Sequence, residues 1–318
     1  MLVPYDNNHD EFAAEPRPVA SDGVTLFDAE AAGDRCSRAP GDDSVTVRLT
    51  VAYDGSSFRG FAANAGVRTV AGTLSQALSR ILGHPVELTG AGRTDAGVHA
   101  QGQVITFAAR ASGLDLAALA RSVNRLCGPA IAVREPTVVV ADFDARYSAT
   151  ARRYRYLVWN RPDPDPFLAG RAWHVERPLD LATMVLGCDP FIGEHDFAAF
   201  CRRPKRRDGE QASLARCVTE AGWTDDGDGL LRFEIEASSF CHQMVRSIVG
   251  TLVDVGAGRK RAGDITAILR TGDRANAGDL APAHGLTLLL VRYDDWSSTG
   301  GGLGSPVGPV DGPDRGGP

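Results

Sequence analysis

A glycine-rich stretch with a single carboxylate is the first feature of this chain that could do chemistry. Residues 90–100 read GAGRTDAGVHA, and Asp95 is their only acidic residue. Glycines let another molecule approach the backbone closely, and an ionised carboxylate can act as a nucleophile or a base. A neighbouring arginine would lower its pKa, and Arg93 and Arg246 are the candidates. From its spacing alone, Asp95 could also be a turn aspartate that caps its own backbone.

Other aspartate chemistries fit the surrounding residues less well. An aspartic protease needs Asp-Thr-Gly or Asp-Ser-Gly twice, whereas Asp95-Ala96-Gly97 occurs once. A retaining glycosidase needs a pair of carboxylates, and no second acid shares the stretch. His99 could join Asp95 at a metal, but no third ligand is near in the sequence. Since nucleotide-binding glycine motifs are also absent, we expect neither a metal nor a cofactor.

Arginines and tyrosines are interleaved in a second stretch, residues 152–156, which reads RRYRY. Guanidinium groups bind phosphates and aromatic rings stack on unpaired bases, so this pattern is typical of RNA-binding surfaces. Residues 202–207, RRPKRR, add five cations that would suit a phosphate backbone. Taken alone, the first stretch could equally be a strand with core tyrosines and solvated arginines. The second could equally be a solvated basic loop. Together they predict RNA contacts from Arg152, Arg153, Arg155, Arg202, Arg203 and Lys205.

The charge of the chain is concentrated in its ends. The net charge of the 318 residues is −6, and residues 1–43 alone contain ten acidic residues against three arginines. Residues 297–318 are rich in glycine and proline, which leaves residues 44–296 slightly basic. Segments of this composition cannot bury a core. We therefore predict disordered tails at 1–43 and 297–318, and a folded part whose charge is compatible with RNA.

The six cysteines are scattered without a C-x-x-C pair. This spacing predicts reduced thiols in a cytoplasmic protein rather than a zinc or redox site. No apolar run approaches the roughly 20 residues of a membrane helix, and the N-terminus lacks the pattern of a secretory signal. We expect no association with a membrane.

Hydrophobic periodicity predicts an α+β fold with two halves, residues 44–145 and 146–296. The first half reads strand, helix, strand, strand, helix, strand, which is the split βαβ or ferredoxin-like pattern. The second half is expected to resemble it, so that an extended antiparallel sheet carries helices on one face and an active-site cleft lies between the halves. The clearest elements are a strand at 45–53, helices at 69–82 and 114–126, a strand at 153–159, a hairpin turning at 228–229 and a helix at 241–255.

Residues 92–100 are similar to the active-site signature of the TruA family of tRNA pseudouridine synthases. The resemblance extends over about residues 45–294, through YDGS at 53–56, ARYSA at 145–149, RYRY at 153–156, GEHDF at 193–197 and HQMVR at 242–246. Two segments depart from the family pattern. FAAN replaces the usual Trp-Gln-x-Gln at 61–64, and CGPAI replaces Leu-Pro-x-Asp-Ile at 127–131. The first departure removes glutamines that could touch RNA.

The resemblance implies isomerisation of uridine to pseudouridine in the anticodon stem-loop, at tRNA positions 38, 39 and 40, without a cofactor. Asp95 matches the catalytic aspartate, Arg246 its basic partner, and Tyr154 the tyrosine that stacks on the target base. Arg93 is the candidate to fill the space of a flipped base, and Leu286 is a further substrate contact. The family resemblance also implies a homodimer in which both chains contact one tRNA.

Two alternatives to this activity differ in the residues they require. An RNA-binding protein of the same fold that has lost catalysis would be expected to lack Asp95, Tyr154 or Arg246, and all three are present. A different enzyme acting on glycosidic bonds, such as a nucleoside hydrolase, would need an acidic cluster that the sequence does not show. Attack on the sugar, attack on the base and removal of a 2′ proton are the three alternative roles for Asp95.

Overall fold

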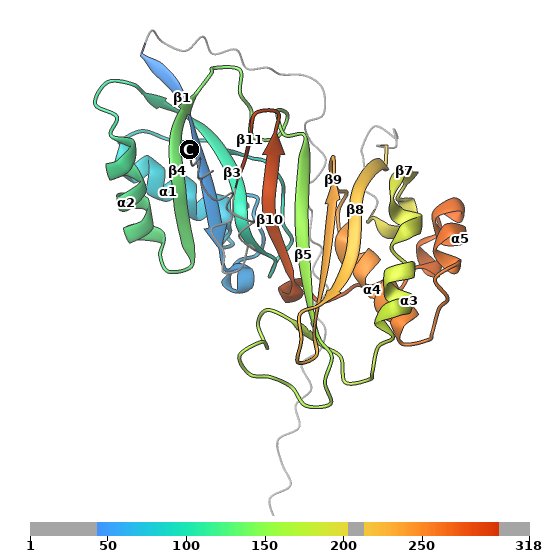
Figure 1. Cartoon of the computed structure of the whole chain (residues 1–318). Helices are drawn as coiled ribbons and strands as arrows, with labels where there is room; N and C mark the ends of the chain where they lie inside the picture. The colour runs from blue at the N-terminus through green and yellow to red at the C-terminus, as the bar shows by residue number, and fades with distance from the viewer. Residues whose placement is uncertain (1–42, 203–212, 299–318) are drawn as a thin grey trace, which may run out of the picture. The chain divides into compact units, whose positions relative to one another are not determined.

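The computed structural model describes residues 43–202 and 213–298, and Figure 1 shows their strands and helices. The strands are β1 (Ser44–Tyr53), β2 (Thr89–Gly90), β3 (His99–Arg110), β4 (Ile131–Val139), β5 (Ala151–Trp159), β6 (Trp173–His174), β7 (Gly193–Asp196), β8 (Ala215–Asp225), β9 (Leu230–Ala237), β10 (Leu286–Tyr293) and β11 (Trp296–Ser297). The α-helices are α1 (Val70–Leu82), α2 (Leu116–Cys127), α3 (Leu181–Leu186), α4 (Met244–Gly256) and α5 (Asp264–Thr271). None of the helices in these two ranges could cross a membrane, because none is both long and apolar enough.

One large, mostly antiparallel sheet joins the strands of the described residues. Its order is β4-β1-β3-β10-β5-β9-β8-β7, and the short strands β2, β6 and β11 pair with β3, β5 and β10. The early and late strands meet where β3 and β10 run parallel, with Thr287 opposite His99 and Leu288 opposite Ala100. Figure 1 shows this junction near the middle of the sheet. It places the start of β10 beside the chain that follows Asp95.

The two faces of the sheet differ in burial. Side chains alternate between faces along a strand, and in β5 Tyr154, Tyr156 and Val158 are buried whereas Arg153 and Arg155 are partly exposed. The burial of β9 alternates in the same way. In Figure 1, α1 and α4 are seen behind the strands, and both contribute fully buried leucines to the core. The predicted mixed fold with a large antiparallel sheet is confirmed.

Local sequence explains where the first two helices begin. The Thr69 hydroxyl accepts a hydrogen bond from the Gly72 N–H at 3.2 Å, which caps α1. Gly83 ends this helix in the left-handed conformation, with φ of 73°. The Asp115 carboxylate caps α2 by accepting from the Ala118 N–H at 2.9 Å. These caps account for the good agreement between the predicted and observed ends of α1 and α2.

The long helix near the C-terminus begins later than the sequence pattern predicts. The expected helix covers 241–255, whereas α4 begins at Met244. Gln243 has a left-handed backbone, with φ of 66°, and a helix cannot continue through that conformation. Cys241 and His242 therefore precede the helix, although the predicted helix included both. The short helix α5 was not predicted from the sequence.

The folded part extends slightly into both predicted tails. The Asp43 carbonyl accepts from the Ala111 N–H at 2.8 Å. At the other end, the buried Ser298 hydroxyl donates to the Gly102 carbonyl at 2.7 Å and accepts from the Val291 N–H at 2.8 Å. The boundary predicted at residue 297 is therefore too early. Residues 1–42 and 299–318 lie outside the described residues.

Removal of residues 1–42 is expected to leave turnover and the melting temperature unchanged. The sheet begins at Ser44, and the preceding sequence has no periodic apolar pattern that could add to the core. A chain that begins at Asp43 behind an initiator methionine would be compared with the full chain by calorimetry and by activity on tRNA. A large loss of either quantity would show that the acidic segment docks on the folded part.

Candidate active site

Two basic side chains from the C-terminal part of the chain hold Asp95. Nη1 of Arg246 donates to Oδ2 of Asp95 at 2.9 Å, and Nε2 of His242 lies 3.2 Å from Oδ1. The predicted ion pair between Asp95 and Arg246 is present. The side chains of Asp95 and Arg246 are 23% and 13% exposed, so water screens this pair less than a pair on the open surface.

The surroundings of Asp95 favour its ionised form. Burial alone would raise the pKa of the carboxyl group, but hydrogen bonds and charge from His242 and Arg246 outweigh burial and bring this pKa below its ordinary value. The Nε of Arg246 also donates to the Ala281 carbonyl at 2.8 Å. That second bond fixes the guanidinium plane toward Asp95. A carboxylate held in this way can act as a base or a nucleophile at neutral pH.

The glycine-rich loop is fixed on both sides of Asp95. Before it, the buried Gln103 amide donates to the Gly92 carbonyl at 2.7 Å and accepts from the Gly92 N–H at 3.3 Å. Thr94 shares a buried 2.7 Å hydrogen bond with the Tyr53 hydroxyl. After it, Gly97 has φ of 81°, which is why a glycine is needed at this turn. The loop is thus held in place by packed strands.

Tyr154 lies on the buried face of β5, next to this loop. It is 7% exposed, and a Cβ placed at Gly92 would lie 3.8 Å from its hydroxyl. The ring of Phe240 meets it edge-on, with the centroids 5.1 Å apart. Burial raises the pKa of the Tyr154 hydroxyl, so this group stays protonated around neutral pH. The structure therefore brings three of the predicted site residues together, Asp95, Arg246 and Tyr154.

The two other predicted substrate contacts, Leu286 and Arg93, differ in burial. Leu286 is the buried first residue of β10 and pairs with Tyr156 of β5. Arg93 is exposed on the glycine-rich loop, two residues before Asp95. The contact of each with a substrate stays a prediction.

Arg152 has a structural position that the sequence analysis did not anticipate. Its side chain is only 8% exposed, and its two terminal nitrogens donate to four carbonyl groups. Nη2 donates to Ala91 at 2.9 Å and to Arg146 at 2.8 Å, and Nη1 donates to Ala149 at 3.1 Å and to Ser238 at 2.8 Å. The interpretation of Arg152 as an RNA contact is wrong, because its guanidinium group binds carbonyls of the glycine-rich loop, of the segment before β5 and of the residue after β9.

Replacing Arg152 with alanine is expected to lower the free energy of unfolding by about 2–4 kcal/mol, because several buried carbonyls lose their donor. The matched control is Arg155→Ala on the same strand, which removes a partly exposed pair with Glu234 and should cost less than about 1 kcal/mol. Calorimetry measures both. An unchanged melting temperature for Arg152→Ala, together with weaker binding of tRNA, would show instead that Arg152 contacts RNA.

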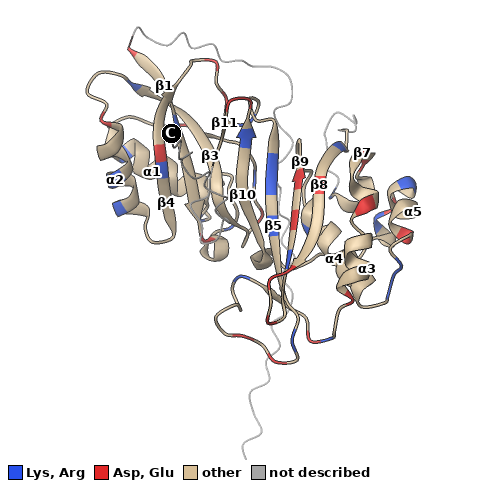
Figure 2. Cartoon of the chain, viewed as in Figure 1, with Lys and Arg blue, Asp and Glu red and all other residues tan. Residues whose placement is uncertain are grey.

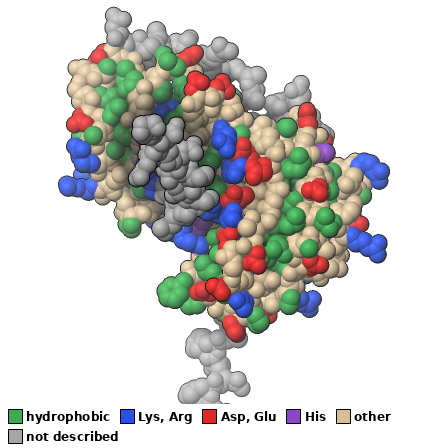
Figure 3. Space-filling model, viewed as in Figure 1, with side chains coloured by type: hydrophobic (Ala, Val, Ile, Leu, Met, Phe, Trp, Pro, Cys, Tyr) green, Lys and Arg blue, Asp and Glu red, His purple; other side chains and the backbone are tan. Residues whose placement is uncertain are grey.

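Arg153 and Arg155 lie on the opposite face of the sheet from Tyr154, because neighbouring residues of a strand alternate. Arg153 is paired with Glu236 at 2.8 Å and also with Glu220, and Arg155 is paired with Glu234 at 2.8 Å. Figure 2 shows basic residues along β5 next to acidic residues on β9, and Figure 3 shows Lys or Arg side chains beside Asp or Glu side chains on the face toward the viewer. RNA contacts from Arg153 and Arg155 stay a prediction, and in the structure both side chains are paired with glutamates from neighbouring strands.

The predicted basic loop is only partly described. Arg202 is exposed, and its backbone N–H donates to the His242 carbonyl at 3.0 Å. Arg203 and Lys205 lie outside the described residues. The start of the loop is therefore next to the histidine that contacts Asp95.

His99 does not share a metal with Asp95. Its Nδ1 accepts from the Gly55 N–H at 3.1 Å, and its Nε2 lies 3.1 Å from the carbonyls of Gly170 and His284. Burial lowers the pKa of this histidine, and the nearby Asp54 carboxylate acts in the opposite direction. His99 thus joins three segments of the chain. Residues 43–202 and 213–298 contain no group of three or more His, Cys, Asp or Glu side chains that could hold a metal.

Comparison with known proteins supports the resemblance noted in the sequence. The model of the tRNA pseudouridine synthase family matches residues 49–148 and 188–294. The chain belongs to this family. The tRNA pseudouridine synthase A of Frankia casuarinae is 42% identical over 256 residues, covering 79% of this chain and 90% of the relative. The enzyme of the same name from Leifsonia xyli is 40% identical over 272 residues, covering 79% and 93%. That from Acetivibrio thermocellus is 39% identical over 248 residues, covering 78% and 99%.

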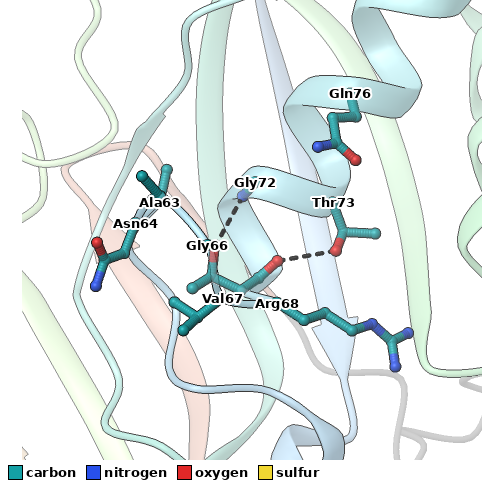
Figure 4. Close-up of a pocket in the computed structure, with 10 residues that line it drawn as sticks. Ala63, Asn64, Gly66, Val67, Arg68, Gly72, Thr73 and Gln76 are labelled. Atoms are coloured by element: carbon teal, nitrogen blue, oxygen red, sulfur yellow. Dashed lines mark hydrogen bonds between the residues drawn. The ribbon is translucent and has the colours of Figure 1, made fainter.

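A pocket of about 600 Å³ lies where this chain departs from the family pattern. Ala63 and Asn64 line it together with Arg68 and the first turn of α1 (Figure 4). Phe61, the first residue of the departure, is buried, and its ring lies 6.3 Å from that of Tyr53. The departure therefore keeps an aromatic residue in the core and places small side chains at the pocket.

One pair of cysteines contradicts the expectation of reduced thiols. Cys201 and Cys241 form a disulfide, and their Cα atoms are 5.8 Å apart. The free cysteines of the described residues are Cys127 and Cys188, which are buried, and Cys217, which is exposed. Spacing in the sequence could not reveal this pair, because the two cysteines are 40 residues apart and meet only in the fold.

His242 is the residue of the site that sequence reasoning missed. The signal was available, since His242 lies in the HQMVR motif four residues before Arg246. In the structure, Nε2 of His242 contacts Oδ1 of Asp95, the carboxylate oxygen that Arg246 does not bind.

Proposed function

We propose that this chain isomerises uridine to pseudouridine in the anticodon stem-loop of tRNA, at positions 38, 39 and 40. The observation that carries the proposal is the ionised Asp95, held by Arg246 and placed beside the buried Tyr154, in a member of the tRNA pseudouridine synthase family. The reaction breaks the N1–C1′ bond and joins C5 to C1′, and the base loses the proton at C5 and gains one at N1. Because substrate and product are isomers, it consumes no other reactant.

Each residue of the site has a definite task in this proposal. Asp95 attacks the sugar, attacks the base or removes a 2′ proton, and each of these steps requires its ionised form. Arg246 maintains that form by lowering the pKa of Asp95. Tyr154 stacks on the target base, and Leu286 lines the place of the base. The assembly of Asp95, Arg246 and Tyr154 argues against the alternative of an inactive RNA-binding protein.

The target uridine must leave the helical stack before Asp95 can reach it. Flipping a base out of a paired stem costs a few kcal/mol and leaves a space that an inserted side chain can fill. Arg93 suits this task, because it is exposed and lies on the same loop as Asp95. Arg202, Arg203 and Lys205 are proposed to contact phosphates, which would supply much of the affinity.

We infer further that residues 44–145 and 146–296 are two halves built on one split βαβ plan. The strand order β4-β1-β3-β2 in the first half is repeated as β10-β5-β9-β8 in the second. Asp95 comes from the first half, and Arg246 and Tyr154 come from the second. This supports an active site between the halves. A homodimer and a cytoplasmic location belong to the same proposal, because the family resemblance implies the first and a tRNA substrate favours the second.

The proposal is tested with the purified chain and tRNA transcripts that carry uridine at only one of positions 38, 39 and 40 of the anticodon stem-loop. Pseudouridine is mapped after incubation. We expect conversion at one or more of these positions, and none in a transcript whose uridines all lie outside the anticodon stem-loop. Conversion only outside the stem-loop would contradict the proposed positions, and no conversion in any transcript would contradict the proposed activity.

A further inference from the structure

The two oxygens of Asp95 have separate partners. Arg246 of α4 donates to Oδ2, and His242, which precedes α4, contacts Oδ1 at 3.2 Å. A single contact to one oxygen would leave the carboxylate free to turn about its Cβ–Cγ bond. Contacts to both oxygens remove that freedom. Since reaction rates depend strongly on the orientation of the reacting group, the second contact matters for chemistry as well as for stability.

The backbone around His242 is held in place from several directions. The next residue, Gln243, adopts a left-handed conformation that is unfavourable for a residue with a Cβ and that is typical of functional sites. The preceding residue, Cys241, is joined to the buried Cys201. The His242 carbonyl itself accepts from the Arg202 N–H at 3.0 Å. These constraints together aim the imidazole at Asp95.

We propose that His242 is a positioning residue that donates from Nε2 to Oδ1 of Asp95 and thereby fixes the orientation of the carboxylate. This inference rests on the proposed function, because it assumes that Asp95 is the reacting group. His242 is 36% exposed, so it lies at the edge of the site, where it can hold Asp95 without blocking the buried face of Tyr154. The family match does not assign this role to His242.

The contact has a consequence for the dependence of turnover on pH. The charged or titratable groups around Asp95 are His242 and Arg246 from the α4 region, Tyr154 from β5 and the exposed Arg93 on its own loop. Burial keeps Tyr154 protonated, and Arg246 remains in every His242 variant. Turnover should fall as pH drops through the pKa of Asp95. Removing His242 removes one of the interactions that lower this pKa, so the fall should occur at a higher pH.

The test uses the full chain, tRNA labelled with 5-tritiated uridine, and two variants. His242→Ala is expected to lower kcat about 10- to 100-fold while KM changes less than about threefold, because phosphate contacts carry much of the affinity. His242→Gln keeps a side-chain donor but no charge. It should retain more of kcat than His242→Ala, and the acid side of its pH profile should still move to higher pH. His84→Ala, at a partly exposed histidine after α1, is the matched control and should change neither quantity.

Two results would overturn the inference. One is a kcat of His242→Ala within about twofold of the wild type, together with an acid side of the pH profile that does not move. The other is a loss of turnover that accompanies a lower melting temperature in both variants, while the acid side of the pH profile does not shift. That result would indicate a structural role only. Asp95→Asn, measured in parallel, distinguishes a failure of the inference about His242 from a failure of the proposed function. If that variant turns over tRNA, the assignment of Asp95 fails, whereas an inactive Asp95→Asn beside unaffected His242 variants rejects His242 alone.

Discussion

Asp95→Asn is expected to abolish pseudouridine formation while tRNA binding stays within a few-fold of the wild type. The asparagine has the same shape and can still accept a hydrogen bond from Arg246, but it cannot act as a base or a nucleophile. Affinity should persist, because protein–RNA contacts to phosphates do not depend on one buried carboxylate. Release of tritium from 5-tritiated uridine in tRNA measures turnover, and filter binding measures affinity.

The matched control for this variant is Asp228→Asn. Asp228 is exposed at the turn between β8 and β9 and has a left-handed backbone, which asparagine tolerates well. Its replacement should leave turnover unchanged. Appreciable tritium release by Asp95→Asn would remove Asp95 from the chemistry.

Arg246→Lys is expected to lower turnover about 100-fold or more, with a much smaller change in tRNA affinity. The arginine donates at once to Asp95 and to the Ala281 carbonyl, and the single ammonium of lysine cannot reproduce this fork. Loss of about 3 kcal/mol of transition-state stabilisation corresponds to roughly 100-fold in rate. Single-turnover rates at saturating enzyme separate the chemical step from binding.

A matched substitution exists on the surface close to the end of α4. Arg259 is paired with Asp254 at 2.6 Å, and its side chain is half exposed, so Arg259→Lys should have little effect on turnover. If Arg246→Lys weakened binding as much as it slowed the reaction, Arg246 would be a substrate contact rather than the partner of Asp95.

The elements with strong local patterns were predictable from the sequence. β1 follows from a two-residue alternation and α1 from a helical apolar face between Thr69 and Gly83, both of which act within a few residues. The pairing of Asp95 with Arg246 was also predictable, because the family motifs contain both residues. These signals lie within the motifs themselves and do not depend on the register of distant strands.

The neighbours of the arginines on β5 were not predictable to the same extent. Alternation places Arg152 on the same face as Tyr154, so its burial could have been inferred from the strand pattern alone. The ion pairs of Arg153 and Arg155 depend on the register between β5 and β9, which sets Arg153 opposite Glu236 and Arg155 opposite Glu234. No local pattern encodes that register.

The position of His242 depends on contacts that are distant in the sequence. A continuous apolar pattern predicted a helix from Cys241, but the disulfide to Cys201 and the contact with the Arg202 N–H hold the chain outside the helix. Tertiary contacts of this kind commonly override helix propensity. Sequence patterns could therefore locate the acid and its arginine, but not the geometry of the histidine beside them.

The most direct test of the central claim is a map of pseudouridine in the tRNA of cells that lack this protein. The cells are complemented either with the wild-type chain or with Asp95→Asn. We predict that pseudouridine at one or more of positions 38, 39 and 40 disappears without the protein, returns with the wild-type chain and does not return with Asp95→Asn. A map that is unchanged by loss of the protein, or that is restored by Asp95→Asn, would contradict the account.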